Sequence, residues 1–196
     1  MLCAFCCLTN HLVRQVLGEI YYKAQSVFEF GLGESTYIAA EVGVPRYAGV
    51  DSDPNWVAMA REKSNMGHFR FYLADIGETK AWGVPVQDLK KNVYNYQLSA
   101  LSSEAKPFDV YLVDGRYRVA CAAACFLHAA SRGANMSNVQ VGVHDQDHLS
   151  RGYHAALTTI AEKSLASTKL FIYKLRNTTT IRDVYLLWER YRTIHK

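Results

Sequence analysis

The sequence predicts an α/β fold, a three-layer, doubly wound arrangement around a mostly parallel sheet. Short apolar segments, typical of buried strands, alternate with segments of helical periodicity along the 196-residue chain. Residues 27–53 show this alternation in order: a strand, a glycine turn, a helix, a second strand and then an acidic residue. Right-handed crossovers bring the carboxyl ends of parallel strands to one edge of the sheet, where ligands bind in this fold class.

Each element is expected from the spacing of its apolar residues. Residues 9–24 place Leu12, Val16 and Ile20, with Leu17 beside them, at helical spacing, which predicts an amphipathic helix before the first strand. The remaining elements follow from alternating apolar runs and periodic segments. The expected helices are 9–24, 34–42, 54–66, 119–130, 153–163 and 181–192, and the expected strands are 27–30, 47–50, 68–74, 108–113, 139–143 and 169–175.

Two helices carry recognisable capping residues. Asp53 is suited to cap the helix that Pro54 begins, because proline fits the first helical position. Gly67 is expected to end that helix. Thr180 and Asp183 have the spacing of a capping box and begin the last helix.

We divide the chain into an N-terminal helical segment, residues 1–24, and a single domain, residues 25–196, with an insert at about 76–107. A connection this long in a compact domain is typically a functional insert or a lid. Its aromatic residues Trp82, Tyr94 and Tyr96 either form a wall over a bound ligand or pack as the small core of the insert itself.

The composition is that of a folded globular protein, with 49% hydrophobic residues, 20% charged residues and a net charge of +4. Basic residues are scattered, which argues against a nucleic-acid partner. The five cysteines are an odd number without a regular framework, so we expect a cytoplasmic protein. Cys3, Cys6 and Cys7 lack a second ligand pair, so no metal site is predicted; Cys121 and Cys125 suit apolar packing on a helix face. The apolar N-terminal stretch is too short to span a bilayer, and a signal peptide stays an alternative.

Polar residues end five successive predicted strands. Gly31 and Gly33 permit a sharp turn and the close approach of a ligand to the backbone. Asp51 lies twenty residues after Gly31, the spacing at which a carboxylate meets a ribose hydroxyl pair. The sequence therefore predicts a nucleoside-containing cofactor. The strand ends carry Glu29 and Gly31, Asp51, Asp75, Asp114, and His144 with Asp145.

Over roughly residues 25–175 the chain resembles the class I S-adenosylmethionine-dependent methyltransferases. Glu29-x-Gly31-x-Gly33 is similar to their first motif, an acid-x-Gly-x-Gly sequence at the end of the first strand. The segments FEFGLGEST, DIGETKAWGVP and VDGRYRVACA resemble an uncharacterised methyltransferase-like group. The resemblance implies S-adenosylmethionine as the cofactor and says little about the acceptor, which our first hypothesis takes to be a small molecule. It also implies Glu29 near the methionine end, Asp51 at the ribose, Asp75 and Ile76 at the adenine, and Asp114 at the end of the fourth motif.

A nicotinamide dinucleotide is the rival cofactor. Its fingerprint has a third glycine where Thr36 stands, and it brings a pyrophosphate to the helix start, where the carboxylate of Glu34 would repel it. The sulfonium and amino groups of S-adenosylmethionine suit that carboxylate better. Ser35 and Thr36 either cap the helix or bind the cofactor carboxylate. Glu29 either serves the cofactor or is a structural carboxylate satisfied by loop N–H groups.

The acceptor chemistry is expected after the fourth and fifth strands. Alignment of two reactants supplies about 7–11 kcal/mol, and a general base adds about 10²–10⁴-fold for a hydroxyl acceptor. His144 is the natural base by its pKa, with Asp145 orienting it, unless this pair simply ends the strand. Arg116 and Arg118 alternate, so at most one is expected to face the site and clamp an anionic group. The candidates are Asp114, His144 and Asp145 for catalysis, and Arg116, Arg118 and Tyr96 for the acceptor.

Two departures from the family pattern leave an alternative open. Only six strands are predicted, whereas the family has seven with a terminal hairpin. Asp114-Gly-Arg-Tyr replaces the asparagine-proline-type motif, which argues against exocyclic-amine acceptors. Because fold does not fix function, a non-catalytic binding module with this fold is the second hypothesis and an NAD-linked enzyme the third.

Overall fold

A seven-stranded sheet between two layers of helices forms the molecule, seen in a computed structural model that describes residues 4–80, 83–87, 93–145, 152–167 and 169–194. Cys3 and Trp82, and the side chains of Cys6 and Cys7, lie outside this description. The strands of the sheet are β1 (Ser26–Phe30), β2 (Arg46–Asp51), β3 (Arg70–Leu73), β6 (Val110–Val113), β7 (Gln140–Val143), β8 (Ala161–Ala166) and β9 (Phe171–Leu175).

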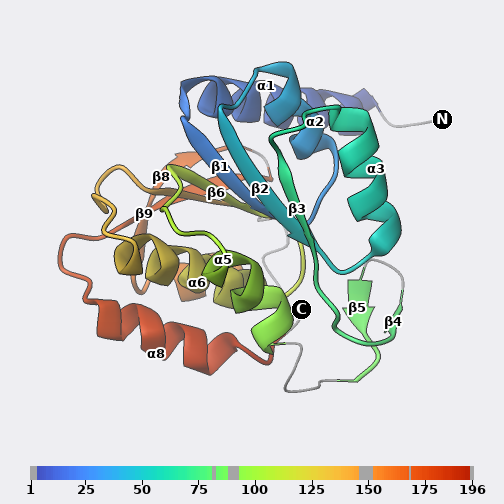
Figure 1. Ribbon diagram of the computed structural model, residues 1–196. Helices are drawn as coiled ribbons and strands as arrows, with labels where there is room; N and C mark the ends of the chain where they lie inside the picture. Colours follow the sequence, from blue (N-terminus) through green and yellow to red (C-terminus); the bar gives the residue numbers. More distant parts are fainter. Residues whose placement is uncertain (1–3, 81–82, 88–92, 146–151, 168, 195–196) are drawn as a thin grey trace.

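The strand order across the sheet is β3-β2-β1-β6-β7-β9-β8 (Figure 1). The first five strands are parallel, and β9 is antiparallel to both β7 and β8. The chain runs from β1 to β2 on one side of the sheet and returns to β6 on the other side of β1. The predicted doubly wound, mostly parallel sheet is therefore confirmed, with its topological switch point between β1 and β6.

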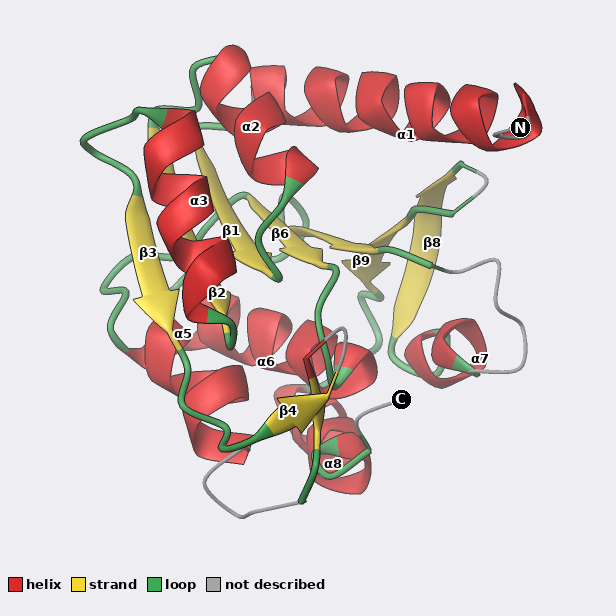
Figure 2. Cartoon of the chain, turned by 90° about the vertical axis from the view of Figure 1, so that its right-hand side faces the viewer, coloured by secondary structure: helices red, strands yellow, loops and turns green. Residues whose placement is uncertain are grey.

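Helices cover both faces of the sheet (Figure 2). One face carries α1 (Ala4–Lys23), α2 (Glu34–Glu41) and α3 (Pro54–Ser64), and the other carries α5 (Ala100–Ser102), α6 (Arg118–Ser131) and α8 (Ile181–Tyr191). A short helix, α7 (Tyr153–Leu157), leads into β8. Throughout the described ranges every helix is too short or too polar to cross a membrane.

The predicted insert contains short elements near the site. A two-stranded hairpin of β4 (Thr79–Lys80) and β5 (Val84–Pro85) lies beyond the carboxyl ends of β2 and β3 (Figure 1). A π-helix, η2 (Val93–Ser99), follows and continues into α5. The insert therefore brings side chains to the same sheet edge as the strand ends.

Apolar side chains on both faces of the sheet explain why two helical layers are needed. Phe28 and Phe30 of β1 belong to the buried cluster that also holds α6, whereas Val27 belongs to the cluster beneath α1 and α2. α6 is rich in alanine, so its backbone lies close to the sheet. Cys121 and Cys125 of α6 are fully buried free thiols, which confirms their packing role.

The predicted capping residues are confirmed. The carboxylate of Asp53 accepts a hydrogen bond from the backbone N–H two residues on, at 2.8 Å. Thr180 and Asp183 form the reciprocal bonds of a capping box, at 2.9 and 3.2 Å. The predicted helix end at Gly67 is wrong, because α3 already ends at Asn65, which adopts the left-handed conformation (φ 49°) that asparagine tolerates.

The predicted helix over 153–163 is wrong beyond Leu157. The chain turns there into β8, an edge strand that pairs with β9 and completes the terminal hairpin. The six-strand prediction is therefore wrong by one strand. β8 is buried at its first residue and exposed at the other five, so it lacks the alternation of apolar residues that marks a strand.

Candidate functional site

The glycine turn after β1 packs directly against the loop after β6. Gly31 has φ +87°, and a Cβ there would lie 2.8 Å from the backbone oxygen of Asp114. The backbone N–H of Asp114 donates to Phe30 at 2.8 Å, which holds the two loops together. Only glycine fits this conformation and this contact. At Gly33, where the backbone is extended, a Cβ would meet no described atom within 4 Å, so the turn is open above this residue.

A cleft of about 960 Å³ lies at the carboxyl ends of the parallel strands. Its walls come from the loops after β1, β2, β6 and β7 and from the insert. The insert contributes Thr79, Lys80, Gly83 and Val84, which sequence reasoning did not single out. The predicted site residues that line the cleft are Gly31, Asp51, Tyr96, Asp114, Arg116, Arg118, His144 and Asp145.

Asp51 ends β2 at the wall of this cleft. One carboxylate oxygen accepts from the backbone N–H of Leu32 and the other from that of Asp53, both at 2.9 Å. Burial raises the pKa of Asp51, although hydrogen bonds from the backbone N–H groups of Leu32, Asp53 and Ser52 oppose the rise. A carboxylate offers about four acceptor positions, so at least one remains for a ligand hydroxyl.

Glu29 lies away from the cleft, in contrast to the cofactor-binding role implied by the first motif. It is fully buried and lines neither this cleft nor the pocket described below. Four hydroxyls donate to its carboxylate: Tyr47 at 2.6 Å, Tyr21 at 2.7 Å, Thr36 at 2.9 Å and Ser35 at 3.1 Å. Burial raises its pKa and these bonds oppose the rise. The donors are hydroxyls, not the loop N–H groups that the sequence suggested, and they tie α1, α2 and β2 to β1.

The pair expected at the adenine is also placed outside the cleft wall. Asp75 is exposed, and its carboxylate accepts from the backbone N–H of Gly77 at 2.9 Å. Ile76 is 2% exposed and packs in the main apolar cluster. Neither residue is among the described residues that line the cleft.

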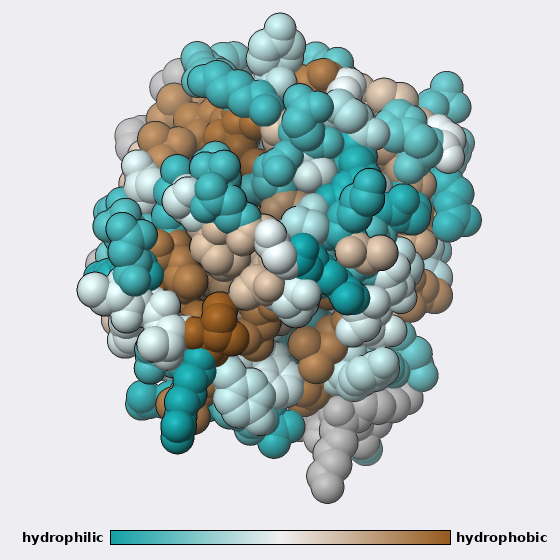
Figure 3. All heavy atoms as spheres, turned by 60° about the vertical axis from the view of Figure 1, so that its left-hand side comes forward, coloured by the Kyte–Doolittle hydropathy of each residue, from teal (hydrophilic) through white to brown (hydrophobic). Residues whose placement is uncertain are grey.

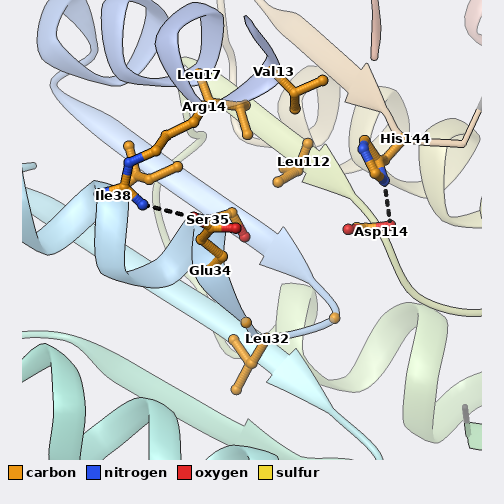
Figure 4. A pocket seen from close by; sticks show the side chains of 12 residues that line it. Val13, Arg14, Leu17, Leu32, Glu34, Ser35, Ile38, Leu112, Asp114 and His144 are labelled. Atoms are coloured by element: carbon orange, nitrogen blue, oxygen red, sulfur yellow. Dashed lines mark hydrogen bonds and ion pairs between the residues drawn. The ribbon is translucent and has the colours of Figure 1, made fainter. Parts of the chain in front are cut away.

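A second, smaller pocket of about 160 Å³ adjoins the cleft between α1 and the glycine turn (Figure 4). It shares four lining residues with the cleft: Gly31, Leu32, Asp114 and His144. Ser35 lines this pocket, so its hydroxyl lies at a ligand-accessible surface while it also donates to Glu29.

His144 and two carboxylates meet where the cleft and the pocket join. Its Nδ1 lies 3.1 Å from Asp114 Oδ1 and 3.4 Å from Asp145 Oδ1. Burial disfavours the imidazolium, but the hydrogen bond to Asp114 and the two negative charges outweigh burial, so the pKa of His144 is raised. An ionised carboxylate only accepts hydrogen bonds, so Nδ1 carries the proton and Nε2 of the neutral ring is an acceptor.

Arg118 lies at the centre of this cluster and is committed to bonds within the protein. Its side chain is 4% exposed. It donates to the backbone oxygens of Gly115 at 3.0 Å and His144 at 2.6 Å, and it pairs with Asp114 at 3.2 Å and Asp145 at 2.8 Å. Because these bonds occupy the guanidinium within the protein, they do not support the expected role of Arg118 in binding an anionic group of the acceptor. Asp114, His144 and Asp145 have ligand atoms within 4.8 Å of one another, a spacing suited to a metal ion, but the guanidinium already supplies a cation there.

Tyr96 of η2 supports the loop after β6. Its hydroxyl accepts from the backbone N–H of Arg116 at 3.3 Å, and a Cβ at Gly115 would lie 1.9 Å from the same hydroxyl. The ring is buried against Phe30 and Tyr117. Burial raises its pKa, which keeps the phenol neutral. Tyr96 therefore packs in the main core of the domain and not in a separate core of the insert, and it is among the residues that line the cleft.

The contribution of α1 was missed from the sequence. Its predicted apolar face included Leu12, but this residue is 44% exposed, and Val13 and Leu17 face the interior and line the pocket. Arg14 pairs with Glu34 at 2.7 Å, so the carboxylate at the start of α2 has a cationic partner from α1. Helical spacing predicted the helix, but its buried face depends on tertiary packing.

Comparison with known proteins fits this description. The chain is similar to a methyltransferase-like protein from Silicibacter pomeroyi, with 26% identity over 92% of this chain and 93% of that chain and a TM-score of 0.74. It also matches the N-methyltransferase NodS from Bradyrhizobium japonicum (12% identity, 86% and 94% of the two chains, TM-score 0.49). A third match is an RNA methyltransferase from Salinibacter ruber in complex with S-adenosyl-L-homocysteine (12% identity, 86% and 93%, TM-score 0.48). No family model and no curated protein matches the chain.

The strand order, the antiparallel β9 and the cleft at the switch point define a Rossmann-like methyltransferase fold. The protein is therefore class I methyltransferase-like, and the resemblance noted in the sequence is confirmed.

Proposed function

We propose that the protein is a methyltransferase that binds S-adenosylmethionine in the 960 Å³ cleft and methylates a small-molecule acceptor. The observation that carries this proposal is the pairing of the Gly31 turn with Asp51 at the ends of adjacent strands, beside the switch point of the sheet. The similarity in fold to the Silicibacter pomeroyi protein over nearly the whole chain supports it.

The residues of the cleft suit this cofactor. Asp51 keeps acceptor capacity for a ribose hydroxyl. Gly33 lines the adjoining smaller pocket, where the open space above it admits part of a ligand close to the backbone. When bound, S-adenosylmethionine supplies the methyl group: the bond between the methyl carbon and sulfur breaks, its electron pair goes to sulfur, and the acceptor atom bonds to the methyl carbon.

In this proposal His144 takes the proton of the acceptor. Asp114 fixes the tautomer through Nδ1, so Nε2 is free to accept the hydroxyl proton as the new bond forms. Arg118 holds the backbone oxygen of His144 and thereby fixes the position of this loop. Alignment by these groups and proton transfer to Nε2 are what the chain itself contributes.

Titration calorimetry with S-adenosylhomocysteine tests the cofactor site. We expect Asp51→Ala to weaken binding by about 1–3 kcal/mol, roughly 5- to 150-fold, because a charged acceptor for the ribose is lost. Glu62→Ala, an exposed acid on α3, is the matched control and should bind like the wild type. A folded wild type that does not bind S-adenosylhomocysteine at high micromolar concentration contradicts the proposal. Binding without methyl transfer to any acceptor would instead support a binding module.

A further inference from the structure

We propose that Tyr96 is a further cofactor-binding residue, whose hydroxyl donates a hydrogen bond to the nucleoside part of the bound cofactor. This inference rests on the proposed function and adds to the cleft a residue from the insert between β3 and β6. Three observations carry it: the hydroxyl lies where two strand-end loops meet, no described group accepts its proton, and a second set of buried hydrogen bonds holds its helix in place.

The hydroxyl of Tyr96 lies where the loops after β1 and β6 meet. A Cβ added at Gly115 would lie 1.9 Å from this hydroxyl and 3.3 Å from the backbone nitrogen of Gly31. Tyr96 lines the cleft together with Gly31 and Asp51, and it is not among the described residues that line the smaller pocket. The hydroxyl therefore belongs to the part of the cleft between the glycine turn and the end of β2, where we place the ribose.

This hydroxyl has a proton to donate. The backbone N–H of Arg116 donates to it at 3.3 Å, which uses one of its lone pairs, and within the described ranges no group accepts its proton. Tyr96 is only 2% exposed, and burial, together with the nearby negative charge of Asp51, raises its pKa, so the phenol keeps the proton. Because a buried donor without an acceptor is unfavourable, a ligand that offers a lone pair at this point gains affinity.

The nucleoside offers the lone pair that this donor needs. The ring nitrogens of adenine and the ring oxygen of ribose accept hydrogen bonds, whereas the ribose hydroxyls can also donate. The ionised carboxylate of Asp51 only accepts, so it suits the ribose hydroxyls, and the phenol suits one of the acceptor atoms. The expected adenine partners Asp75 and Ile76 are not among the described residues of the cleft wall, so Tyr96 supplies a polar contact to the nucleoside that they do not.

The residue after Tyr96 holds it in position. Gln97 of the π-helix η2 is fully buried. Its amide group donates to the backbone oxygen of Arg192 at 2.7 Å, and its side-chain oxygen accepts from the indole N–H of Trp188 at 2.9 Å. The hydroxyl of Tyr96 is therefore fixed before a ligand arrives, which reduces the conformational entropy lost on binding. A π-helical turn is frequently found at functional sites, and this one fits that pattern.

Matched removal of two buried hydroxyls tests the proposal. Tyr96→Phe removes the donor and keeps the ring. Tyr111→Phe is the control, since the hydroxyl of Tyr111 is also buried and bonded, to His128 and the backbone N–H of Phe108, but lies outside the described cleft wall. The probes for titration calorimetry are S-adenosylhomocysteine and 5′-methylthioadenosine, which lacks the amino-acid end. We expect Tyr96→Phe to bind both about threefold to tenfold more weakly, and Tyr111→Phe to bind both like the wild type.

A measurement at the hydroxyl itself separates ligand binding from support of the loop. In protein labelled with ¹³Cζ-tyrosine, the resonance of Tyr96 is assigned by its loss in Tyr96→Phe. We expect this resonance to shift when 5′-methylthioadenosine is added, because a donated hydrogen bond changes the electron density at Cζ. The bond from the Arg116 N–H is present without a ligand, so a purely structural role would leave the resonance unmoved. An unmoved resonance in the saturated protein therefore overturns the proposal even if affinity falls in Tyr96→Phe.

The other outcomes separate this proposal from the function on which it rests. A folded wild type that binds neither probe overturns the proposed function itself. Normal binding of S-adenosylhomocysteine by both the wild type and Tyr96→Phe overturns only the role of Tyr96. Weaker binding of S-adenosylhomocysteine but not of 5′-methylthioadenosine assigns the bond to the amino-acid end and overturns its assignment to the nucleoside. An equal loss of affinity in Tyr111→Phe shows a general effect of losing a buried hydroxyl and contradicts the proposal.

Discussion

Replacing Arg118 with methionine removes a buried cation while keeping an unbranched side chain in its place. The guanidinium contacts two backbone oxygens and two carboxylates, so its loss leaves four acceptors with fewer donors. Removing one partner of a buried ion pair typically costs about 3–5 kcal/mol. The carboxylates of Asp114 and Asp145 are 38% and 27% exposed, so water reaches them when the guanidinium is gone. We therefore expect the lower end of that range, about 3 kcal/mol.

Urea denaturation measures this loss as a change in the free energy of unfolding. Arg118→Lys is the matched control, since it keeps the charge but cannot hold two carbonyls and two carboxylates at once; we expect an intermediate loss. The positive charge of Arg118 also lowers the pKa of His144, so in Arg118→Met an NMR titration should show that pKa still higher than in the wild type. An unfolding free energy within about 1 kcal/mol of wild type would refute the assignment of Arg118 as the clamp of these loops.

Two further predictions concern the turn and the histidine. Gly31→Ala should destabilise the protein by about 2 kcal/mol or more, because φ is +87° and the new Cβ would contact the backbone of Asp114. Gly33→Ala is the control and should leave the melting temperature nearly unchanged. Equal effects of the two substitutions would contradict this prediction. Burial lowers the pKa of His144, but Asp114 and Asp145 raise it by more, so the pKa is higher in the folded state than in the unfolded state. The imidazolium therefore contributes stability that is fully present below the unfolded pKa of about 6.5 and is lost as pH rises through the folded pKa. Methyl transfer should rise with pH through that same folded pKa, and a flat profile, or one unchanged in His144→Gln, would exclude His144 as the base.

The sequence predicted the five parallel strands because each is an apolar run that ends in a polar residue. That pattern is strong for β1, β2, β6 and β7, whose residues are mostly buried because helices cover both faces, and weaker for β3, whose residues are exposed or half-buried. It located Asp51, Asp114 and His144 at one edge without any knowledge of tertiary contacts. β8 lacks the pattern because only one of its residues is buried, so its alanine-containing sequence was compatible with a helix.

The side-chain partners of the strand-end residues depend on contacts between distant segments. The carboxylate of Glu29 accepts hydrogen bonds from hydroxyl groups on α1, α2 and β2, and nothing in the spacing of the first motif predicts donors from three elements. Arg116 and Arg118 were both candidates to bind the acceptor because they are cations beside a strand end, and at most one of them was expected to face the site. The side chain of Arg118 is instead 4% exposed. The residue before it, Tyr117, has a left-handed backbone (φ 54°), a conformation that is rare for a residue with a bulky side chain.

The hydroxyl cluster around Glu29 makes the N-terminal helix part of the domain's internal support. A chain shortened to begin at residue 25 would lose Tyr21, the donor that α1 contributes, and would bring solvent to a carboxylate that is fully buried in the intact chain. The same truncation would remove Val13 and Leu17, and with them the part of the smaller pocket's wall that α1 provides. Removal of the first helix would therefore cost stability and part of the wall of the smaller pocket together, even though the main cleft lies elsewhere.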